Sequence, residues 1–238
     1  MAENVALIIA GGCGARMGQD IPKQFLNVYD RPVIVYTMEA FQKHPNVDSI
    51  VVVCIDGWHE TLKAYARQFG ITKLEAIVSG GKNGQDSIRE GLNNIALRHD
   101  ESTVVLIHDA IRPMISPDII SDCIRVCTEK GNAFSVVPCT AAMLCTSDGK
   151  TSTEQVPRDN LKITQTPQSA RLGTLLDAHN EALERGITNS VATCTLFVEL
   201  GKKLYFSIGS EKNLKLTTPE DMEIFKALLN SRRDEWMH

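Results

Sequence analysis

Residues 5–18 read VALIIAGGCGARMG: six apolar residues run directly into a loop that contains four glycines. A short apolar run of this kind predicts a buried strand. Glycines let backbone amide groups approach phosphate oxygens without a Cβ in the way. A strand that leads into such a loop predicts an α/β protein with a phosphate site after its first strand. A tight connection without any ligand is the plainer alternative.

Two other glycine signatures do not fit this loop. A P-loop needs Lys and then Ser or Thr after its last glycine, whereas this chain has Gln19-Asp20. A dinucleotide-binding fingerprint needs glycine where Met17 stands. The loop instead carries Arg16, and Lys23 follows soon after it. Cations beside backbone donors suit the charge that grows on phosphoryl oxygens and on pyrophosphate during nucleotidyl transfer.

Apolar runs alternate with helical patterns as far as Val137. We expect strands at Val5–Ala10, Ser49–Ile55, Ala76–Val78, Thr103–Ile107 and Ala133–Val137. We expect helices at Pro32–Lys43, along Trp58–Phe69, at Asp86–Leu97 and at Pro117–Cys127. Continuous Val/Ile strands separated by helices predict a mostly parallel, twisted sheet that is buried on both faces, as in a Rossmann-like α/β domain. Ligands bind such a sheet outside the carboxyl ends of its strands.

The pattern changes after Pro138. Residues 139–166 alternate weakly and contain no long helix, and Ser147-Asp148-Gly149-Lys150 is a hairpin turn signal. We interpret 139–166 as a protruding β-arm used for dimer contacts. Helices at Arg171–Arg185, Val191–Leu200 and Thr218–Asn230, with a strand at Lys203–Ile208, then complete one domain over 1–238.

Composition excludes several classes of partner and predicts a cytoplasmic protein. Net charge is −4 and the isoelectric point is about 5.9, so neither nucleic acid nor an anionic membrane is expected to bind. The seven cysteines form no CxxC pair, which is typical of reduced thiols in the cytoplasm. The first apolar run is too short for a signal sequence or a membrane span.

Asp109 follows the strand expected at Thr103–Ile107, at the edge where ligands bind. Mg²⁺ favours one or two carboxylates together with substrate phosphates, so Asp109 is the candidate metal ligand. Capping of the next turn is the alternative. We interpret His108 as a packed, hydrogen-bonded neighbour.

The loop and Pro22-Lys23-Gln24 resemble the opening of the small cytidylyltransferases that act on methylerythritol 4-phosphate or ribitol 5-phosphate. The resemblance runs the length of the chain. Its further motifs are Gly80-Gly81 with Asp86-Ser87-Ile88, His108-Asp109-Ala110-Ile111-Arg112-Pro113, Pro157-Arg158, Gln165-Thr166-Pro167-Gln168 and Asn213–Asp221.

The resemblance implies a nucleotidyltransferase that uses CTP, Mg²⁺ and a phosphorylated polyol. The implied catalytic cations are Arg16, Lys23 and Lys215. The implied CTP-binding residues are Ala10, Gly11, Gly12, Gly14, Gly80, Gly81 and Ser87. The implied contacts of the acceptor phosphate are Arg112, Arg158 and Thr166. Because the matching Arg158 serves the neighbouring subunit's site, the resemblance also implies a homodimer.

The sequence departs from the family at a few positions. In the CTP half, Gly84 replaces an arginine. In the acceptor half, Ala141 and Ala142 replace an Asp-Thr pair, and Val191 and Ala192 replace a Ser/Thr-Asp pair. Polar groups that read substrate hydroxyls give strong discrimination, so their loss indicates an altered acceptor half.

Three alternatives follow for the activity. Ribitol 5-phosphate is the favoured acceptor, with methylerythritol 4-phosphate or another phosphorylated polyol as the alternatives. Uridylyl or guanylyl transfer to a sugar phosphate is a second possibility, because those enzymes share the GGxGxRM loop. A nucleotide-binding protein without turnover is the non-enzymatic alternative.

Overall fold

The computed structural model describes residues 3–12 and 21–234 of the chain. Its central sheet has the order β11-β7-β10-β6-β1-β4-β5. These strands are β1 (Asn4–Ala10), β4 (Ser49–Cys54), β5 (Leu74–Ser79), β6 (Val104–Asp109), β7 (Asn132–Pro138), β10 (Lys162–Arg171) and β11 (Phe206–Ile208). Every pair is parallel except those of β10, which runs antiparallel to both β6 and β7. The predicted, mostly parallel sheet is confirmed, but β10 was not predicted.

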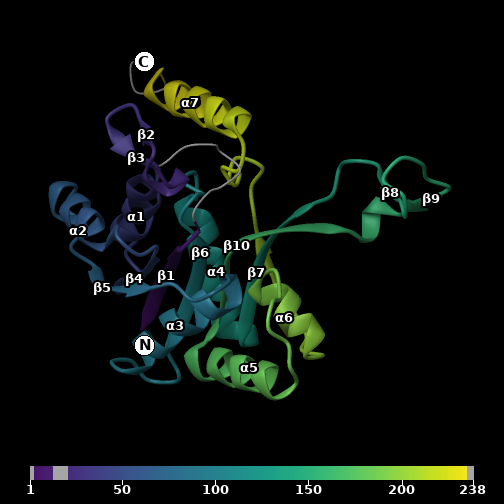
Figure 1. Cartoon of the computed structure of the whole chain (residues 1–238), viewed down its shortest axis with the longest axis horizontal. Coiled ribbons are helices and arrows are strands. Elements are labelled where there is room, and N and C mark those ends of the chain that lie inside the picture. Colours follow the sequence, from purple (N-terminus) through teal and green to yellow (C-terminus); the bar gives the residue numbers. More distant parts are fainter. Residues whose placement is uncertain (1–2, 13–20, 235–238) are drawn as a thin grey trace.

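Helices cover both faces of the sheet, which makes the sheet the middle of three layers (Figure 1). One face carries α1 (Val33–Lys43), α2 (His59–Gln68) and α4 (Pro117–Lys130). The other carries α3 (Gly84–Ala96), α5 (Leu172–Glu184) and α6 (Thr193–Glu199). Because successive side chains of a strand point to opposite faces, Ile8 packs in the first layer and Leu7 in the second.

A third hydrophobic cluster fastens the last helix to the body. Helix α7 (Pro219–Asp234) buries Phe225, whose ring meets Tyr36 of α1 edge-on at 5.3 Å. Beside it lies a short hairpin of β2 (Asn27–Val28) and β3 (Arg31–Pro32), which was not predicted. Its turn places Tyr29 at a positive φ of 56° without the Asn-Gly or Asp-Gly pair that usually announces such a turn.

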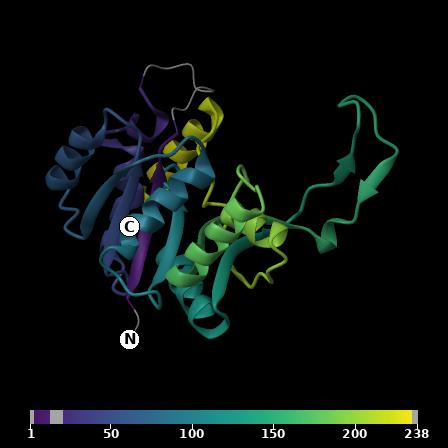
Figure 2. The ribbon, with the colours of Figure 1, turned by 60° about the horizontal axis from the view of Figure 1, so that its bottom comes forward.

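The predicted β-arm extends away from the body in both ribbon views (Figures 1 and 2). It contains β8 (Met143–Cys145), β9 (Glu154–Val156) and the short 3-10 helix η3 (Arg158–Asn160). Asp148 builds the turn by accepting hydrogen bonds from the amides of Lys150 and Thr151. Residues 162–166 belong to β10 rather than to the arm, because the first three of them pair with β7 before an irregularity between Thr164 and Gln168.

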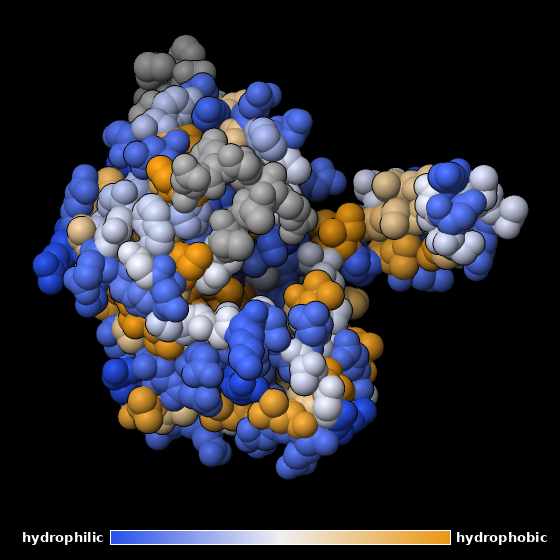
Figure 3. Space-filling model, in the orientation of Figure 1, coloured by the Kyte–Doolittle hydropathy of each residue, from blue (hydrophilic) through white to orange (hydrophobic). Residues whose placement is uncertain are grey.

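Apolar side chains are exposed on the arm, where Figure 3 shows them among polar ones. Leu144 is 65% exposed and Met143 43% exposed. A two-stranded ribbon has no core of its own, so much of these two side chains stays exposed in a single chain.

None of the helices in the described ranges is long and apolar enough to cross a membrane.

Candidate active site

A cavity of about 580 Å³ opens at the carboxyl ends of β1 and β6. It brings together most of the residues that the sequence singled out. The predicted residues in its wall are Ala10, Gly11, Gly12, Lys23, Gly81, Ser87, Asp109, Arg112, Thr166 and Lys215. Gly14 and Arg16 lie outside the described residues. Arg158 is described but does not line this cavity.

The glycine-rich wall is built by close packing against the start of α3. The Ser87 hydroxyl accepts a hydrogen bond from the Gly81 amide at 3.1 Å. A Cβ on Gly81 would stand 2.4 Å from the Cβ of Asp86, so no larger residue fits there without moving the helix. Gly80 also packs against Ser87, because a Cβ added to Gly80 would stand 3.2 Å from the Ser87 hydroxyl. The glycines therefore allow a helix to begin directly beside the cavity.

Gln24 holds the glycine loop to the segment that carries Lys23. Its side chain is 2% exposed and donates to the carbonyl oxygens of Ala10 at 2.8 Å and Gly12 at 3.0 Å. This contact places the 3-10 helix η2 (Lys23–Phe25) against the end of β1. The sequence motif included Gln24, but nothing in its pattern predicted the bracing role.

Two cations converge on Asp109 at the end of β6. Arg112 Nε lies 3.0 Å from one carboxylate oxygen, and Lys215 Nζ lies 3.1 Å from the other. Burial alone would raise the pKa of the Asp109 carboxyl, but Lys215 and Arg112 together lower it below the ordinary range. The group is therefore ionised, and it fixes both cations beside the cavity. Arg112 is held further by a 2.7 Å hydrogen bond to the Asn213 carbonyl.

His108 sits behind this cluster and fixes the direction of the Thr166 hydroxyl. The ring is fully buried, and burial lowers its pKa to about 4, so it is neutral. Nε2 lies 3.1 Å from the Arg112 carbonyl, which can only accept, so Nε2 carries the hydrogen. Nδ1 must then accept from the Thr166 hydroxyl at 3.0 Å. This geometry agrees with the interpretation of His108 as a packed neighbour.

Thr166 consequently has no hydrogen left for a ligand. Its oxygen also accepts the Asp109 amide hydrogen at 3.1 Å, which leaves one lone pair. An ionised phosphate oxygen can only accept hydrogen bonds. The Thr166 hydroxyl could therefore donate to an acceptor phosphate only if its hydrogen bond to His108 were broken. The phosphate role of Thr166 stays a prediction.

Glutamine side chains hold the part of the wall that lies just before α6, and one of them, Gln85, comes from α3 itself. Gln85 accepts from the Ser190 amide at 2.8 Å, and Gln168 accepts from the Cys194 amide at 2.9 Å. Between these two fixed points, Val191 and Ala192 line the cavity, as does Gly84. The substitutions at 84, 191 and 192 thus do lie at the candidate site. Ala141 and Ala142 are exposed at the base of the arm, outside the wall of this cavity.

Arg158 does not line the cavity of its own chain. It lies on the arm, and its guanidinium donates to the Thr140 carbonyl at 2.8 Å. A single chain therefore does not bring Arg158 together with Arg112 and Lys215.

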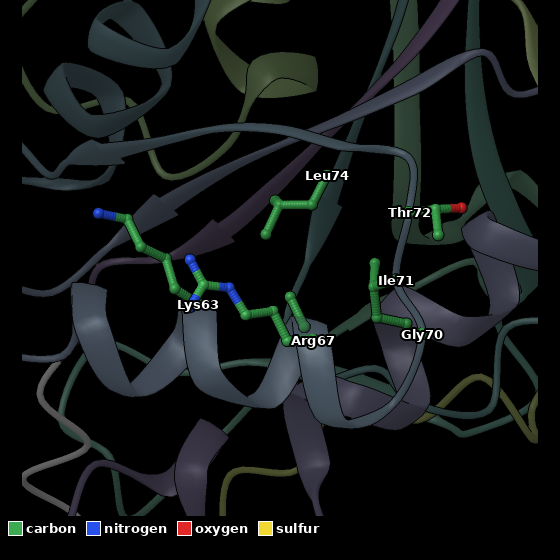
Figure 4. A pocket seen from close by; sticks show the side chains of 7 residues that line it. Lys63, Arg67, Gly70, Ile71, Thr72 and Leu74 are labelled. Atoms are coloured by element: carbon green, nitrogen blue, oxygen red, sulfur yellow. The ribbon is translucent and has the colours of Figure 1, made fainter.

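A second, shallower hollow of about 310 Å³ lies between α2 and the start of β5 (Figure 4). Its cations are Lys63, which is ion-paired to Glu60 at 2.6 Å, and Arg67. It sits at the amino end of β5, whereas ligands of parallel sheets bind at the carboxyl ends. We therefore assign the candidate site to the larger cavity.

Comparison with known proteins agrees with this geometry. Residues 4–231 match the family model described as 2-C-methyl-D-erythritol 4-phosphate cytidylyltransferase (IspD). The chain is 41% identical to a ribitol-5-phosphate cytidylyltransferase of Lacticaseibacillus paracasei, over 95% of this chain and 98% of that protein. It is 36% identical to a 2-C-methyl-D-erythritol 4-phosphate cytidylyltransferase of Geotalea uraniireducens, over 97% and 98%.

Solved structures resemble the fold. 4-Diphosphocytidyl-2C-methyl-D-erythritol synthase from Anaerococcus prevotii has a TM-score of 0.80 at 21% identity, over 96% of this chain and 99% of that one. 2-C-methyl-D-erythritol 4-phosphate cytidylyltransferase from Thermus thermophilus has a TM-score of 0.75 at 23% identity, over 94% and 98%. The predicted α/β fold is confirmed.

Proposed function

Because the chain belongs to the 2-C-methyl-D-erythritol 4-phosphate cytidylyltransferase family, whose members are nucleotidyltransferases, we propose that it transfers CMP from CTP to ribitol 5-phosphate. The products are CDP-ribitol and pyrophosphate. One observation carries the proposal: a glycine-lined wall and the Asp109–Arg112–Lys215 cluster face the same cavity. An acidic cavity would repel two phosphorylated substrates, whereas this one is lined by the cations Lys23, Arg112 and Lys215.

The reaction needs little chemistry from the protein. A phosphate oxygen of the acceptor forms a new bond to the α-phosphorus of CTP, and the bond from that phosphorus to the pyrophosphate oxygen breaks. The attacking phosphate is already an anion at neutral pH, so no general base is required. Lys23, Lys215 and Arg112 would screen the repulsion between the two anions and hold the attack in line.

Asp109 fits the role of Mg²⁺ ligand. It supplies the one carboxylate among the described residues of the cavity wall, and Mg²⁺ binds through one or two carboxylates plus substrate phosphates. Arg112 and Lys215 each occupy one of its oxygens, and each oxygen keeps a further lone pair. When bound, the ion would neutralise charge on the triphosphate.

The named relatives favour ribitol 5-phosphate as the acceptor, and the site supports a phosphorylated acceptor in general. Relatives named ribitol-5-phosphate cytidylyltransferase are 36–41% identical to the chain. The guanidinium of Arg112, 12% exposed, suits a phosphate oxygen at the floor of the cavity. 2-C-Methyl-D-erythritol 4-phosphate is the second candidate, since a relative with that name is also 36% identical.

We further propose a cytoplasmic homodimer joined through the arm. Exposed Leu144 and Met143 would be covered by a second copy, and Arg158 would reach that copy's cavity. The described cysteines are all free thiols, as in reducing compartments. Neither nucleic acid nor membrane is part of the proposal.

Pyrophosphate release is the direct test. The purified chain with Mg²⁺ should release pyrophosphate from CTP with ribitol 5-phosphate, faster than with 2-C-methyl-D-erythritol 4-phosphate. All four triphosphates should be compared, because a preference for UTP or GTP contradicts cytidylyl transfer. Tight CTP binding without turnover on any polyol phosphate would identify a nucleotide-binding protein instead.

A further inference from the structure

The side chain of Thr193 is buried at the cavity wall without a hydrogen-bond partner. Thr193 is the first residue of α6, is 3% exposed and lines the cavity. Its hydroxyl is the one buried, unpartnered side-chain polar atom among the described residues of that wall. Buried hydroxyl groups are normally hydrogen-bonded, so this exception needs an explanation.

Hydrogen bonds fix the backbone on both sides of Thr193. Ser190 is fixed by Gln85, and the Cys194 amide is fixed by Gln168. The Thr195 hydroxyl, two residues further on, is bonded as acceptor and as donor: it accepts from the Ala192 amide at 2.9 Å and donates to the Ala192 carbonyl at 2.7 Å. Thr193 is therefore held in place on both sides, while its hydroxyl alone has nothing to bond.

We infer that the Thr193 hydroxyl recognises a hydroxyl group of the acceptor polyol. This rests on the proposed function. Val191 and Ala192 offer no polar side-chain atom to a polyol, so Thr193 is the hydroxyl that this part of the wall retains. Thr193 directly follows Val191 and Ala192, the positions at which the family resemblance places groups that hold the acceptor's hydroxyls, and all three residues line the cavity.

The chemistry of a hydroxyl suits this role. It can donate and accept at once, as a polyol hydroxyl does, so the two pair without any charge change. Threonine also populates more than one rotamer, which lets the group turn toward a ligand. Leaving the Thr193 hydroxyl unpaired costs free energy in the free protein, and a hydrogen bond to the acceptor recovers it. An analogue that lacks the matching hydroxyl leaves Thr193 unpaired and therefore binds less tightly.

Thr193→Val and Thr193→Ser test the inference on the full chain. Valine keeps the shape and removes the hydroxyl, whereas serine keeps the hydroxyl. With ribitol 5-phosphate, Thr193→Val should raise the acceptor KM about tenfold, the effect of one neutral hydrogen bond, and leave the CTP KM unchanged. Thr193→Ser should stay close to wild type. Ser87→Ala, on the nucleotide wall, should show the opposite pattern by raising mainly the CTP KM.

Thermal melting separates recognition from a structural role. Removing an unsatisfied hydroxyl should keep the Tm of Thr193→Val or raise it by about 2–4 °C, while acceptor binding weakens. A lower Tm together with equal losses for both substrates would show a structural role and overturn the inference. An unchanged acceptor KM in a folded Thr193→Val would overturn it as well.

Acceptor analogues complete the test. Among singly deoxygenated ribitol 5-phosphates, one should bind wild type and Thr193→Val equally, because both sides of the hydrogen bond are then missing. If every analogue shows the same preference for wild type, Thr193 reads no hydroxyl. A wild-type protein that turns over no polyol phosphate at all would instead refute the proposed function.

Discussion

The Nζ atom of Lys215 lies 3.1 Å from Oδ1 of Asp109, although 106 positions separate the two residues in the sequence. The contact joins the end of β6 to the loop before α7, and Arg112 holds the other oxygen of the same carboxylate. Asp109 thus positions two cations at the place where two phosphorylated substrates would meet.

Lys215→Ala should lower kcat by about two orders of magnitude, since a fixed cation opposite developing phosphoryl charge supplies that much. Pyrophosphate release under saturating substrates measures it. Lys212→Ala is the matched control, because Lys212 is exposed on the same loop and does not line the cavity. Equal rates for the two variants would remove Lys215 from the catalytic cations.

Gly81→Ala should weaken CTP binding and lower the Tm. The added Cβ would stand 2.4 Å from the Asp86 Cβ and 3.0 Å from the Ser87 amide nitrogen, so the start of α3 must shift. Gly84→Ala is the control, since a Cβ there meets nothing within 4 Å, so its Tm should stay at or above that of the wild type. Titration calorimetry with CTP and thermal melting measure the CTP affinity and the Tm of the two variants. The interpretation fails if Gly81→Ala binds CTP as the wild type does.

The sequence predicted where the cavity lies, but it did not predict strand β10 or the hydrogen bonds that hold the cavity wall together. Continuous apolar runs such as Val5–Ala10 predicted the strands, and the ligand-binding edge followed from them. Strand β10 could not be foreseen, because its pattern, KITQTPQSAR, lacks a Val/Ile run and contains a proline. The hydrogen bond of Gln24 to the Ala10 carbonyl and that of Thr166 to His108 depend on tertiary contacts, for which periodicity gives no signal.

Thr166→Val should destabilise the fold by about 1–3 kcal/mol, because it leaves the Asp109 amide and His108 Nδ1 buried without a partner. Thr166→Ser keeps the hydroxyl and should melt near the wild-type temperature. Thr164→Val, on the same strand but exposed, is the control for introducing valine. Melting curves of the three variants decide the matter. A stable Thr166→Val would show that the His108 bond contributes little.

His99 should make stability depend on pH. Burial alone would lower its pKa, but hydrogen bonds to Glu3 at 2.7 Å and Glu75 at 2.9 Å raise it above the ordinary value of about 6.5. A raised pKa contributes stability below the unfolded value, and that contribution is lost as pH rises through the folded value.

The wild type should therefore melt above His99→Gln by about 2–4 °C at pH 6, since such partly exposed pairs contribute up to about 1 kcal/mol. The difference should shrink by pH 9. Melting both proteins across this range measures it, and a difference that stays constant with pH would show that charge on His99 plays no part.

Arg158 should act in the cavity of a second copy, because it lies on the arm and does not line the cavity that holds Lys215. Arg158→Ala and Lys215→Ala homodimers should both be nearly inactive. Mixing them by unfolding and refolding should restore activity, since one site of each heterodimer then has both residues intact. With random pairing, about a quarter of wild-type activity is expected. A mixture as inactive as its parents, under conditions in which light scattering detects dimers, would place Arg158 outside the partner's site.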